Sequence, residues 1–513
     1  MRFAPALLLV LGACGRGGLP LVPPPDAGVA MGGAGGGDTG GVPVPPLDWS
    51  IAVGQPTSPT TEGFTTAAAV IAVSDGGAIV AGIFGGSVSF APDKRLTATD
   101  TGAAFIARYR KDRQLVWVTP LSAASIAVAD MAALGSDEVA VAGWFEGVLI
   151  SAGTNAGRTA TSAGGQDAFI VRVAADGSIR WMTRAGGRGD DIARGIAARA
   201  PLAANGPGPI AIVISGAVGD AASFGNPDGL GFPPPAPGQP GPVYAARLDG
   251  EGNFAWASFA GSGVPGQGHG VALDPTGGVL VTGYVNGLAG FGTTPAGTAV
   301  SINPAEGRGF VARWDADGEI AWAVPLAGPD GDGKAVAVAV DGAIVVAGQF
   351  EGRARFGTSD AAPTLIADAQ GQPGAYLAGF SPEGRTRWAR RLTGVGVWPW
   401  RTRFAPNGDL LVAGSFGGGI VLDPDGPRPT RMFSRGSDDV VFARATAEGE
   451  LLWAAAEGGL GDDEAADITG ARDGSVWGVG SYVGPARFGT EASATETLPS
   501  GTDGAGFLAH YVR

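Results

Sequence analysis

Carboxylates gathered in glycine-rich loops are the first residues of this chain whose types and spacing could do chemistry. Three loops carry them, as Asp190 with Asp191, Asp330 with Asp332, and Asp462 with Asp463. Clustered carboxylates suit Ca²⁺, which takes about six to eight oxygen ligands. None of these loops has the full alternation of oxygen ligands found in a calcium loop, and aspartate also forms turns and caps. A calcium site is therefore one hypothesis for these acids, and a structural role in turns is the other.

Three tryptophans that do not follow the repeat described below are candidates for binding a ligand. Trp398 and Trp400 flank Pro399 in the phrase VWPWR, which we expect in a loop between repeats, and Trp144 is the third. Binding residues concentrate on loops held by a rigid scaffold, and a large ring offers a stacking surface. We predict that these three residues contact an unknown protein or glycan ligand. The alternative for each is packing in the core.

Nucleophilic and metal-dependent catalysis has little support in the sequence. The chain has two histidines, His269 in a glycine-rich loop and His510 in the last strand. Neither accompanies a serine or cysteine nucleophile motif. A histidine metal cluster and a phosphate-cradling loop are also missing. We therefore expect a protein that is not an enzyme and has no cofactor.

The solitary cysteine, Cys14, ends an N-terminal segment that reads MRFAPALLLVLGAC. The apolar run in residues 6–11 is far shorter than the roughly 20 residues that cross a bilayer, so it indicates a secretion signal. The stretch LGAC resembles the bacterial lipobox, which implies cleavage before Cys14 and a lipid on its sulfur. We expect residues 1–13 to be a lipoprotein signal peptide. An ordinary signal peptide with a chance cysteine is the alternative.

Residues 14–46 form the next segment, in which glycine and proline dominate. Positions 15–46 hold 11 Gly and 7 Pro, too few large apolar side chains to repay the entropy of ordering. We predict a disordered tether between the lipid on Cys14 and the rest of the chain. The membrane would then be a partner through this anchor. The expected location is the bacterial cell envelope, at the outer membrane or cell surface.

Charge excludes one class of partner. The chain has 34 Lys and Arg against 48 Asp and Glu, for a net charge of -14. This charge opposes binding to the nucleic-acid backbone, and we expect no nucleic-acid partner.

The strands that position all these residues are indicated by tryptophans at near-constant spacing along the sequence. They are Trp49, Trp117, Trp181, Trp256, Trp322, Trp388 and Trp453. Six of them end the same two-strand phrase, as in GFVARWDADGEIAW (309–322), whereas Trp49 has no such phrase before it. The missing half is GFLAHYVR (506–513), at the other end of the chain. A period of this length indicates a repeat protein, and the split repeat predicts that the terminal strands pair.

Each repeat carries four strand signals joined by tight turns. In 333–392 the strand AVAVAV is followed by the turn Asp341-Gly342, the strand AIVVAGQF, and two further strands around Glu383-Gly384. Gly supplies the positive φ that such turns need. Four strands per repeat over 47–513 predict an all-β, seven-bladed β-propeller of four-stranded blades, closed by pairing of the N- and C-terminal strands. The small-residue strand should be innermost. An open solenoid is the alternative.

Three phrases carry a resemblance to a known family: GGRGDDIARGIAA (186–198), QDAFIVRVAADGSIRW (166–181) and GGLGDDEAADITGARDGSVWGVGSYVG (458–484). They resemble the bacterial repeats called SBBP, for seven-bladed beta-propeller. Two repeats depart from the pattern, with SAAS (122–125) and GVGVWPW (394–400) in place of Gly-Asp-Asp. The resemblance implies an extracellular or envelope-attached scaffold and no single activity.

Taken together, the sequence predicts an envelope-anchored bacterial lipoprotein whose propeller is a non-catalytic binding or scaffolding module. The alternative is a secreted propeller enzyme that acts on polysaccharide or another polymer. Two carboxylates at a defined separation in a deep pocket would mark the enzyme.

Overall fold

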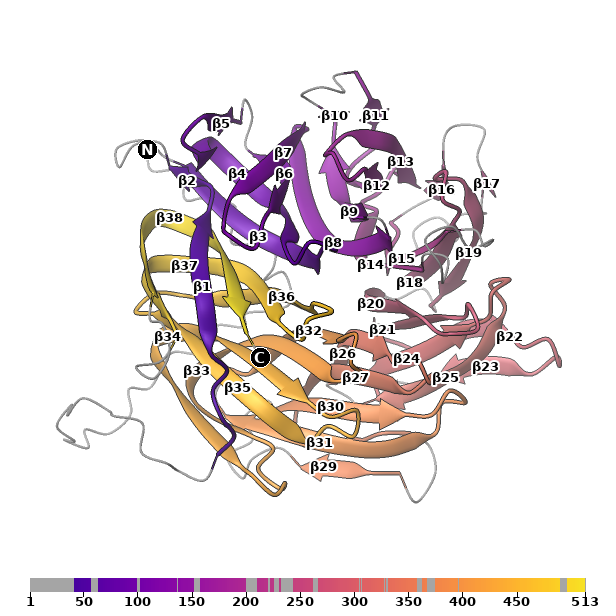
Figure 1. Ribbon diagram of the computed structural model, residues 1–513. Helices are drawn as coiled ribbons and strands as arrows, with labels where there is room; N and C mark the ends of the chain where they lie inside the picture. The colour runs from indigo at the N-terminus through magenta and orange to yellow at the C-terminus, as the bar shows by residue number, and fades with distance from the viewer. Residues whose placement is uncertain are drawn as a thin grey trace, which may run out of the picture. The chain divides into compact units, whose positions relative to one another are not determined.

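Antiparallel β-strands make up all the regular structure that the computed structural model describes (Figure 1). The described residues are 41–513 without 57–62, 99–101, 136, 152–156, 200–209, 220–221, 226–229, 232–242, 262–265, 304, 306, 327, 329–330, 358–361, 367–373, 395, 490–495 and 513. No helix in this part of the chain is long and apolar enough to cross a membrane. The all-β prediction is thus confirmed.

The strands follow one another as four-stranded antiparallel units, each a simple meander. In order, the units are β3 (Gly63–Ala72), β4 (Ala78–Ala91), β6 (Ala103–Tyr109) and β7 (Leu115–Ser122); β8 (Ser125–Gly135), β9 (Glu138–Glu146), β12 (Asp167–Val173) and β13 (Ile179–Gly187); β14 (Ile192–Arg199), β15 (Ala211–Ala217), β18 (Val243–Leu248) and β19 (Phe254–Ala260); β20 (Gly266–Leu273), β21 (Val279–Val285), β24 (Gly309–Trp314) and β25 (Ile320–Leu326); β26 (Asp332–Val338), β27 (Ile344–Phe350), β30 (Gly374–Phe380) and β31 (Thr386–Gly394); β32 (Trp398–Phe404), β33 (Leu410–Leu422), β34 (Thr430–Ala445) and β35 (Leu451–Gly459); and β36 (Glu464–Gly470), β37 (Val476–Phe488), β38 (Glu496–Tyr511) and β1 (Leu47–Val53).

Shorter strands extend the units at their edges. They are β2 (Gln55–Pro56), β5 (Lys94–Thr97), β10 (Val148–Ser151), β11 (Thr159–Thr161), β16 (Ala222–Phe224), β17 (Leu230–Gly231), β22 (Ala289–Thr293), β23 (Ala299–Ile302), β28 (Arg353–Arg355) and β29 (Thr364–Ile366). Some of them join neighbouring units, because β7 pairs with β10 and β13 pairs with β16.

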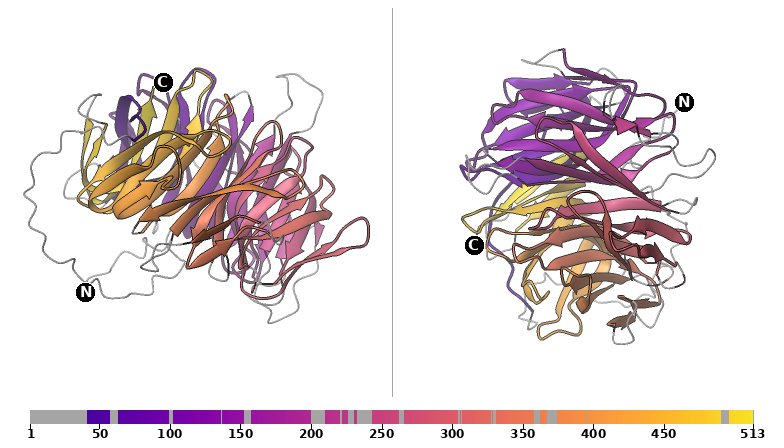
Figure 2. Two further views of the ribbon diagram at one scale, coloured as in Figure 1. Left: turned by 90° about the horizontal axis from the view of Figure 1, so that it is seen from below. Right: turned by 90° about the vertical axis from the view of Figure 1, so that its right-hand side faces the viewer.

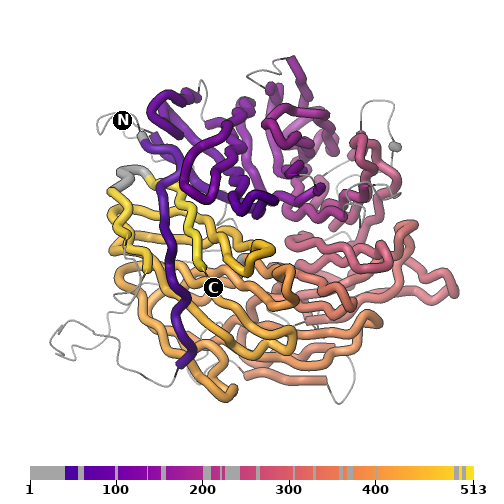
Figure 3. The backbone as a smooth tube through the Cα atoms, viewed as in Figure 1, coloured from indigo at the N-terminus to yellow at the C-terminus, as the bar shows by residue number. Residues whose placement is uncertain are grey.

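The terminal strands pair as the split repeat predicts. β1 runs antiparallel to β38, from Val53 opposite Gly506 to Leu47 opposite Tyr511. In Figure 3 the indigo N-terminal strand lies along the yellow C-terminal strands. One four-stranded unit is therefore built from both ends of the chain.

The first strands of the units, β3, β8, β14, β20, β26, β32 and β36, lie against one another in that order, and β36 also lies against β3. Except for β32, which reads WPWRTRF, they are the small-residue strands expected innermost. Packing between them is close: a Cβ added at Gly195 would stand 2.8 Å from the carbonyl oxygen of His269 on the next first strand. Only glycine fits that approach. Figure 2 shows the units as successive sheets that pack face against face.

Repeat tryptophans pack against a turn of the following unit. The indole nitrogen of Trp256 donates a 2.9 Å hydrogen bond to the carbonyl of Ala316, in a turn of the following unit. Gly318 in that turn has φ of +87°, and a Cβ there would stand 2.7 Å from the Trp256 ring. The same ring-on-glycine contact joins Trp117 to Gly177, Trp181 to Gly252, Trp322 to Gly384 and Trp388 to Gly449. These tryptophans pack between units, as predicted.

The hydrophobic core accordingly lies between units. One cluster contains Val213 of β15 and Val281 of β21; another contains Leu280 of β21 and Val346 of β27. Each unit therefore contributes apolar side chains to both of its neighbours, and no single unit has a core of its own.

Candidate active site on the first strands

Every first strand carries a β-bulge at the same place in its pairing register. The residues at these bulge positions are Ala68, Ala129, Arg194, His269, Lys334, Trp400 and Ala466. A bulge leaves one residue outside the ladder and re-aims its side chain. Since alanine is sufficient for this backbone on β3, β8 and β36, the large side chains on the other four strands are not required by the fold.

His269 and Asp332 meet because their strands, β20 and β26, are neighbours. The Nδ1 atom of His269 lies 3.4 Å from Oδ1 of Asp332, and their side chains are 11% and 17% exposed. Both atoms are buried without a hydrogen-bond partner. The separation is long for a hydrogen bond, but catalytic contacts often tighten only when substrate binds. The other ring nitrogen, Nε2, lies 2.9 Å from the side-chain oxygen Oε1 of Gln267, which accepts its proton.

The protonation states of this pair suit a base beside a fixed negative charge. Burial lowers the pKa of His269, and the nearby charges of Lys334 and Arg194 lower it further, against the opposing effect of Asp332. Burial by itself raises the pKa of Asp332, but the charges of His269 and Lys334 outweigh it and hold that pKa well below its ordinary value. At neutral pH the histidine is therefore uncharged and the carboxyl group is ionised.

Cationic side chains surround the pair. Lys334 places Nζ 2.7 Å from Oδ2 of Asp332. The guanidinium of Arg194 lies 5.1 Å from the ring centre of Trp144, so a ring predicted to bind ligand supports a cation of the site. The Arg308 guanidinium lies 4.8 Å from the ring centre of Tyr284.

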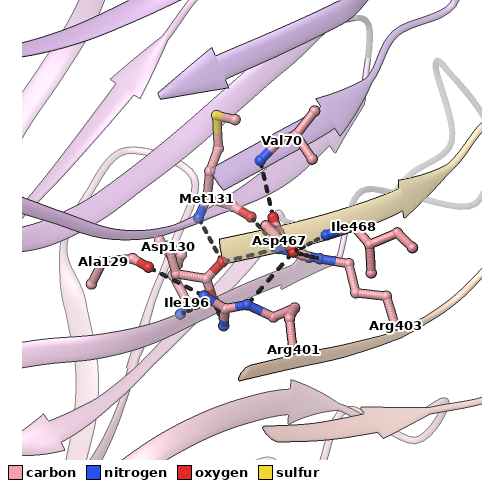
Figure 4. Close-up of polar contacts among 9 residues, drawn as sticks. All are labelled: Val70, Ala129, Asp130, Met131, Ile196, Arg401, Arg403, Asp467 and Ile468. Carbon is pink, nitrogen blue, oxygen red and sulfur yellow. Dashed lines mark hydrogen bonds and ion pairs between the residues drawn. The ribbon is translucent and has the colours of Figure 1, made fainter. Parts of the chain in front are cut away.

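Four charged residues next to the bulges form an ion cluster between first strands that are far apart in sequence (Figure 4). Arg403 of β32 lies 2.9 Å from Asp130 of β8 and 2.9 Å from Asp467 of β36. Arg401 lies 3.0 Å from Asp130 and 3.5 Å from Asp467. We name Asp130, Arg401, Arg403 and Asp467 the strand clasp.

Backbone amides complete the strand clasp. Asp467 accepts a 3.0 Å hydrogen bond from the amide of Val70 on β3, and Asp130 accepts a 3.2 Å bond from the amide of Ile196 on β14. Burial lowers the pKa of Arg403, but the two carboxylates outweigh it and raise that pKa above its ordinary value. Both carboxylates are fully committed to arginines and amides, so the clasp is structural and supplies no free acid or base.

The predicted calcium residues do not gather in one place. Asp191 accepts from the amides of Gly187 and Gly219, and Asp463 accepts from those of Gly459 and Val483. Asp190 and Asp462 are exposed. Asp332 belongs to the histidine pair, and Asp330 lies outside the described residues. Within the described ranges, no group of three or more His, Cys, Asp or Glu side chains is placed to hold a metal ion.

The other predicted residues are placed as follows. Trp398 and Trp400 were expected in a loop, but both lie in β32, because their backbone pairs with β33. Trp398 is half-buried, and the side chain of Trp400 lies outside what the structure describes. Trp144 is 8% exposed, which leaves little of its ring for a ligand. Cys14 lies outside the described residues, so its lipidation stays a prediction.

A second histidine-aspartate pair is a structural contrast. Nδ1 of His510 lies 2.9 Å from Asp48, across the paired terminal strands. The His510 ring is fully buried and stacks 4.2 Å from the ring centre of Trp477. With no exposed atom, His510 cannot reach a substrate.

A cleft of about 480 Å³ lies at the hairpin ends of β3, β8 and β36. Much of its charged lining is paired within the protein: Lys111 lies 3.0 Å from Asp473, and Arg108 bridges Asp75 and Asp137.

No protein-family model matches the chain, and no curated protein matches it significantly. A solved exotype rhamnogalacturonan lyase, YesX, aligns over 92% of this chain and 91% of its own, at 12% identity and a TM-score of 0.29. A solved puromycin hydrolase aligns over 70% of this chain and 58% of its own, at 17% identity and a TM-score of 0.24. The fold is all-β and propeller-like; likenesses this distant carry no argument about substrate.

The expectation that the chain is not an enzyme is corrected here. Both solved structures named above are enzymes, but at TM-scores below 0.5 they carry no argument about this chain. The expectation gives way to the chain's own residues, which bring His269, Asp332 and cationic side chains together. The sequence did not reveal this because His269 and Asp332 lie on different repeats and no local motif joins them. Aligning the repeats on their hairpins would have shown Arg194, His269 and Lys334 where other repeats have alanine.

Proposed function

We propose that this protein is an enzyme that acts on a polysaccharide or another polymer. In this proposal His269 is the general base that removes a proton from the substrate. The observation that carries the proposal is the buried contact between Nδ1 of His269 and Oδ1 of Asp332, 3.4 Å apart, with His269 at a bulge position where the repeat itself needs only alanine. A positioned histidine with a pKa near the working pH is the commonest general base in enzymes.

The roles of the neighbouring side chains follow from their contacts. In the contact with Oε1 of Gln267, Nε2 of His269 is the donor. Once substrate displaces Gln267, the Asp332 carboxylate against Nδ1 favours the tautomer with the proton on Nδ1 and the lone pair on Nε2. Gln267 occupies Nε2 at 2.9 Å and must give way to substrate. Trp398 begins the neighbouring first strand β32 and is a candidate for stacking on a sugar ring of the polymer.

Replacement of the base tests the proposal. We expect His269→Gln to lower the turnover of a cleaved polymer by about 10² to 10⁴, with an unchanged melting temperature. His510→Gln is the matched control, and it should lower the melting temperature and leave turnover intact. Cleavage would be followed by size-exclusion chromatography of a polysaccharide panel. Wild-type turnover in His269→Gln, or intact polymers throughout the panel with wild-type protein, would contradict the proposal.

We also infer that the four-stranded units are the blades of a seven-bladed propeller closed through its termini. The succession of first strands, each against the next, supports this, as does the pairing of β1 with β38. An experimental map with a different number of blades would contradict it. The SBBP-like identity of the repeats, the lipid on Cys14 and the envelope location remain predictions.

A further inference from the structure

We propose that the substrate of this site is a polymer of uronic acids, and that the protein cleaves it by β-elimination. This inference rests on the proposed function, because it assigns substrate and reaction to the same histidine site. Two observations support it: the charged side chains around His269, and the hydrogen bonds that hold the buried carboxyl groups on backbone amides.

The charge of the site is the first argument. The whole chain has a net charge of -14 and three lysines. Among the described groups that shift the pKa of His269, Lys334 and Arg194 are cationic and Asp332 is anionic. Arg308 adds a third cation through Tyr284, whose ring centre lies 5.6 Å from that of His269. The Nε atom of Arg308 is buried without a hydrogen-bond partner. A local excess of cations in an acidic protein favours an anionic ligand.

Among the described residues, no carboxyl group with a raised pKa is placed to protonate a substrate at this site. Hydrolysis of a glycosidic bond by paired carboxyl groups needs one of them protonated. Asp332 is held ionised. The described carboxyl groups with raised pKa values are Asp167, Asp191, Asp439, Glu457 and Asp463. All five are buried at 1% exposure or less and accept hydrogen bonds from backbone amides. None of them can reach a substrate.

β-Elimination uses the groups that are present. In a uronate, the carbon that bears the carboxylate is C5, and the glycosidic oxygen leaves from C4. Nε2 of His269 takes the C5 proton, the electron pair forms the C4=C5 double bond, and the C4–O bond breaks. The imidazolium then returns that proton to the leaving oxygen, so the step balances without water or an oxidant. Lys334 and Arg194 would neutralise the carboxylate as charge develops on it.

The experiment compares a uronate polymer with the same polymer after reduction of its carboxyl groups. We expect the uronate polymer to yield a product that absorbs in the ultraviolet through its conjugated double bond, and the reduced polymer to remain intact. In ¹⁸O-labelled water the new chain ends should contain no label. Lys334→Gln and Arg194→Gln should each lower kcat/KM at least about tenfold, as loss of a charge-stabilising contact does.

The controls are matched in chemistry. Lys94→Gln removes an exposed lysine of β5, and Arg391→Gln removes a surface arginine paired with Asp425; both should leave kcat/KM unchanged. Cleavage with ¹⁸O incorporation and no ultraviolet product would overturn elimination while the proposed function stands. Equal cleavage of the reduced polymer would overturn the uronate assignment. No cleavage of either polymer, with another polymer cleaved in a His269-dependent manner, would overturn this inference alone.

Discussion

At the scale of residues, one histidine is converted into a base by its surroundings. His269 and His510 each lie beside an aspartate, but only the His269 side chain keeps an exposed fraction, of 11%. Burial and cations lower the pKa of His269, and Asp332 opposes them. As a result, the His269 ring is uncharged at neutral pH, while the Asp332 carboxylate still orients it.

The opposing effect of Asp332 gives a prediction with a definite sign. Because the carboxylate raises the pKa of His269, Asp332→Asn should lower that pKa further. The base must be neutral to work, so the acid limb of kcat/KM should lie below the ordinary histidine value of 6.5 in the wild type and move to lower pH in the variant. The maximal rate should fall as well. A pH-rate profile measures both; Asp425→Asn serves as control, and an acid limb that stays in place would count against the assigned roles.

At the scale of elements, the repeat tryptophans decide how one unit holds the next. Trp322 donates a 3.1 Å hydrogen bond to the carbonyl of Pro382 and covers Gly384. Trp322→Ala should lower the free energy of unfolding by roughly 3 to 5 kcal/mol through the cavity it opens. Trp322→Phe should retain most of the packing and lose about 1 kcal/mol with the hydrogen bond. Denaturant titration checks this against Val340→Ala, at a 94% exposed site; equal midpoints for Trp322→Ala and Val340→Ala would refute the role.

At the scale of the whole molecule, the strand clasp joins first strands from separate parts of the chain. Arg403 neutralises two carboxylates that are at most 5% exposed. Arg403→Met should lower the free energy of unfolding by about 3 to 5 kcal/mol, because it leaves buried charge uncompensated. Arg391→Met, which breaks a surface pair, should lower it by at most about 1 kcal/mol. Differential scanning calorimetry compares the two variants, and similar melting temperatures would show that the clasp adds nothing.

What the sequence by itself determined is periodic or local. The tryptophan spacing, the Asp-Gly hairpins and the complementary terminal half-repeats predicted antiparallel strands and the pairing of β1 with β38, because each signal lies within one repeat or recurs in all. The tertiary structure alone decided that His269 meets Asp332 and that Asp130 meets Arg403. Those contacts depend on which residues near the bulges face one another between first strands of different repeats, a relation that no local pattern records. The loop expected around Trp398 became a strand for the same reason, since pairing with β33 outweighs the turn tendency of Pro399.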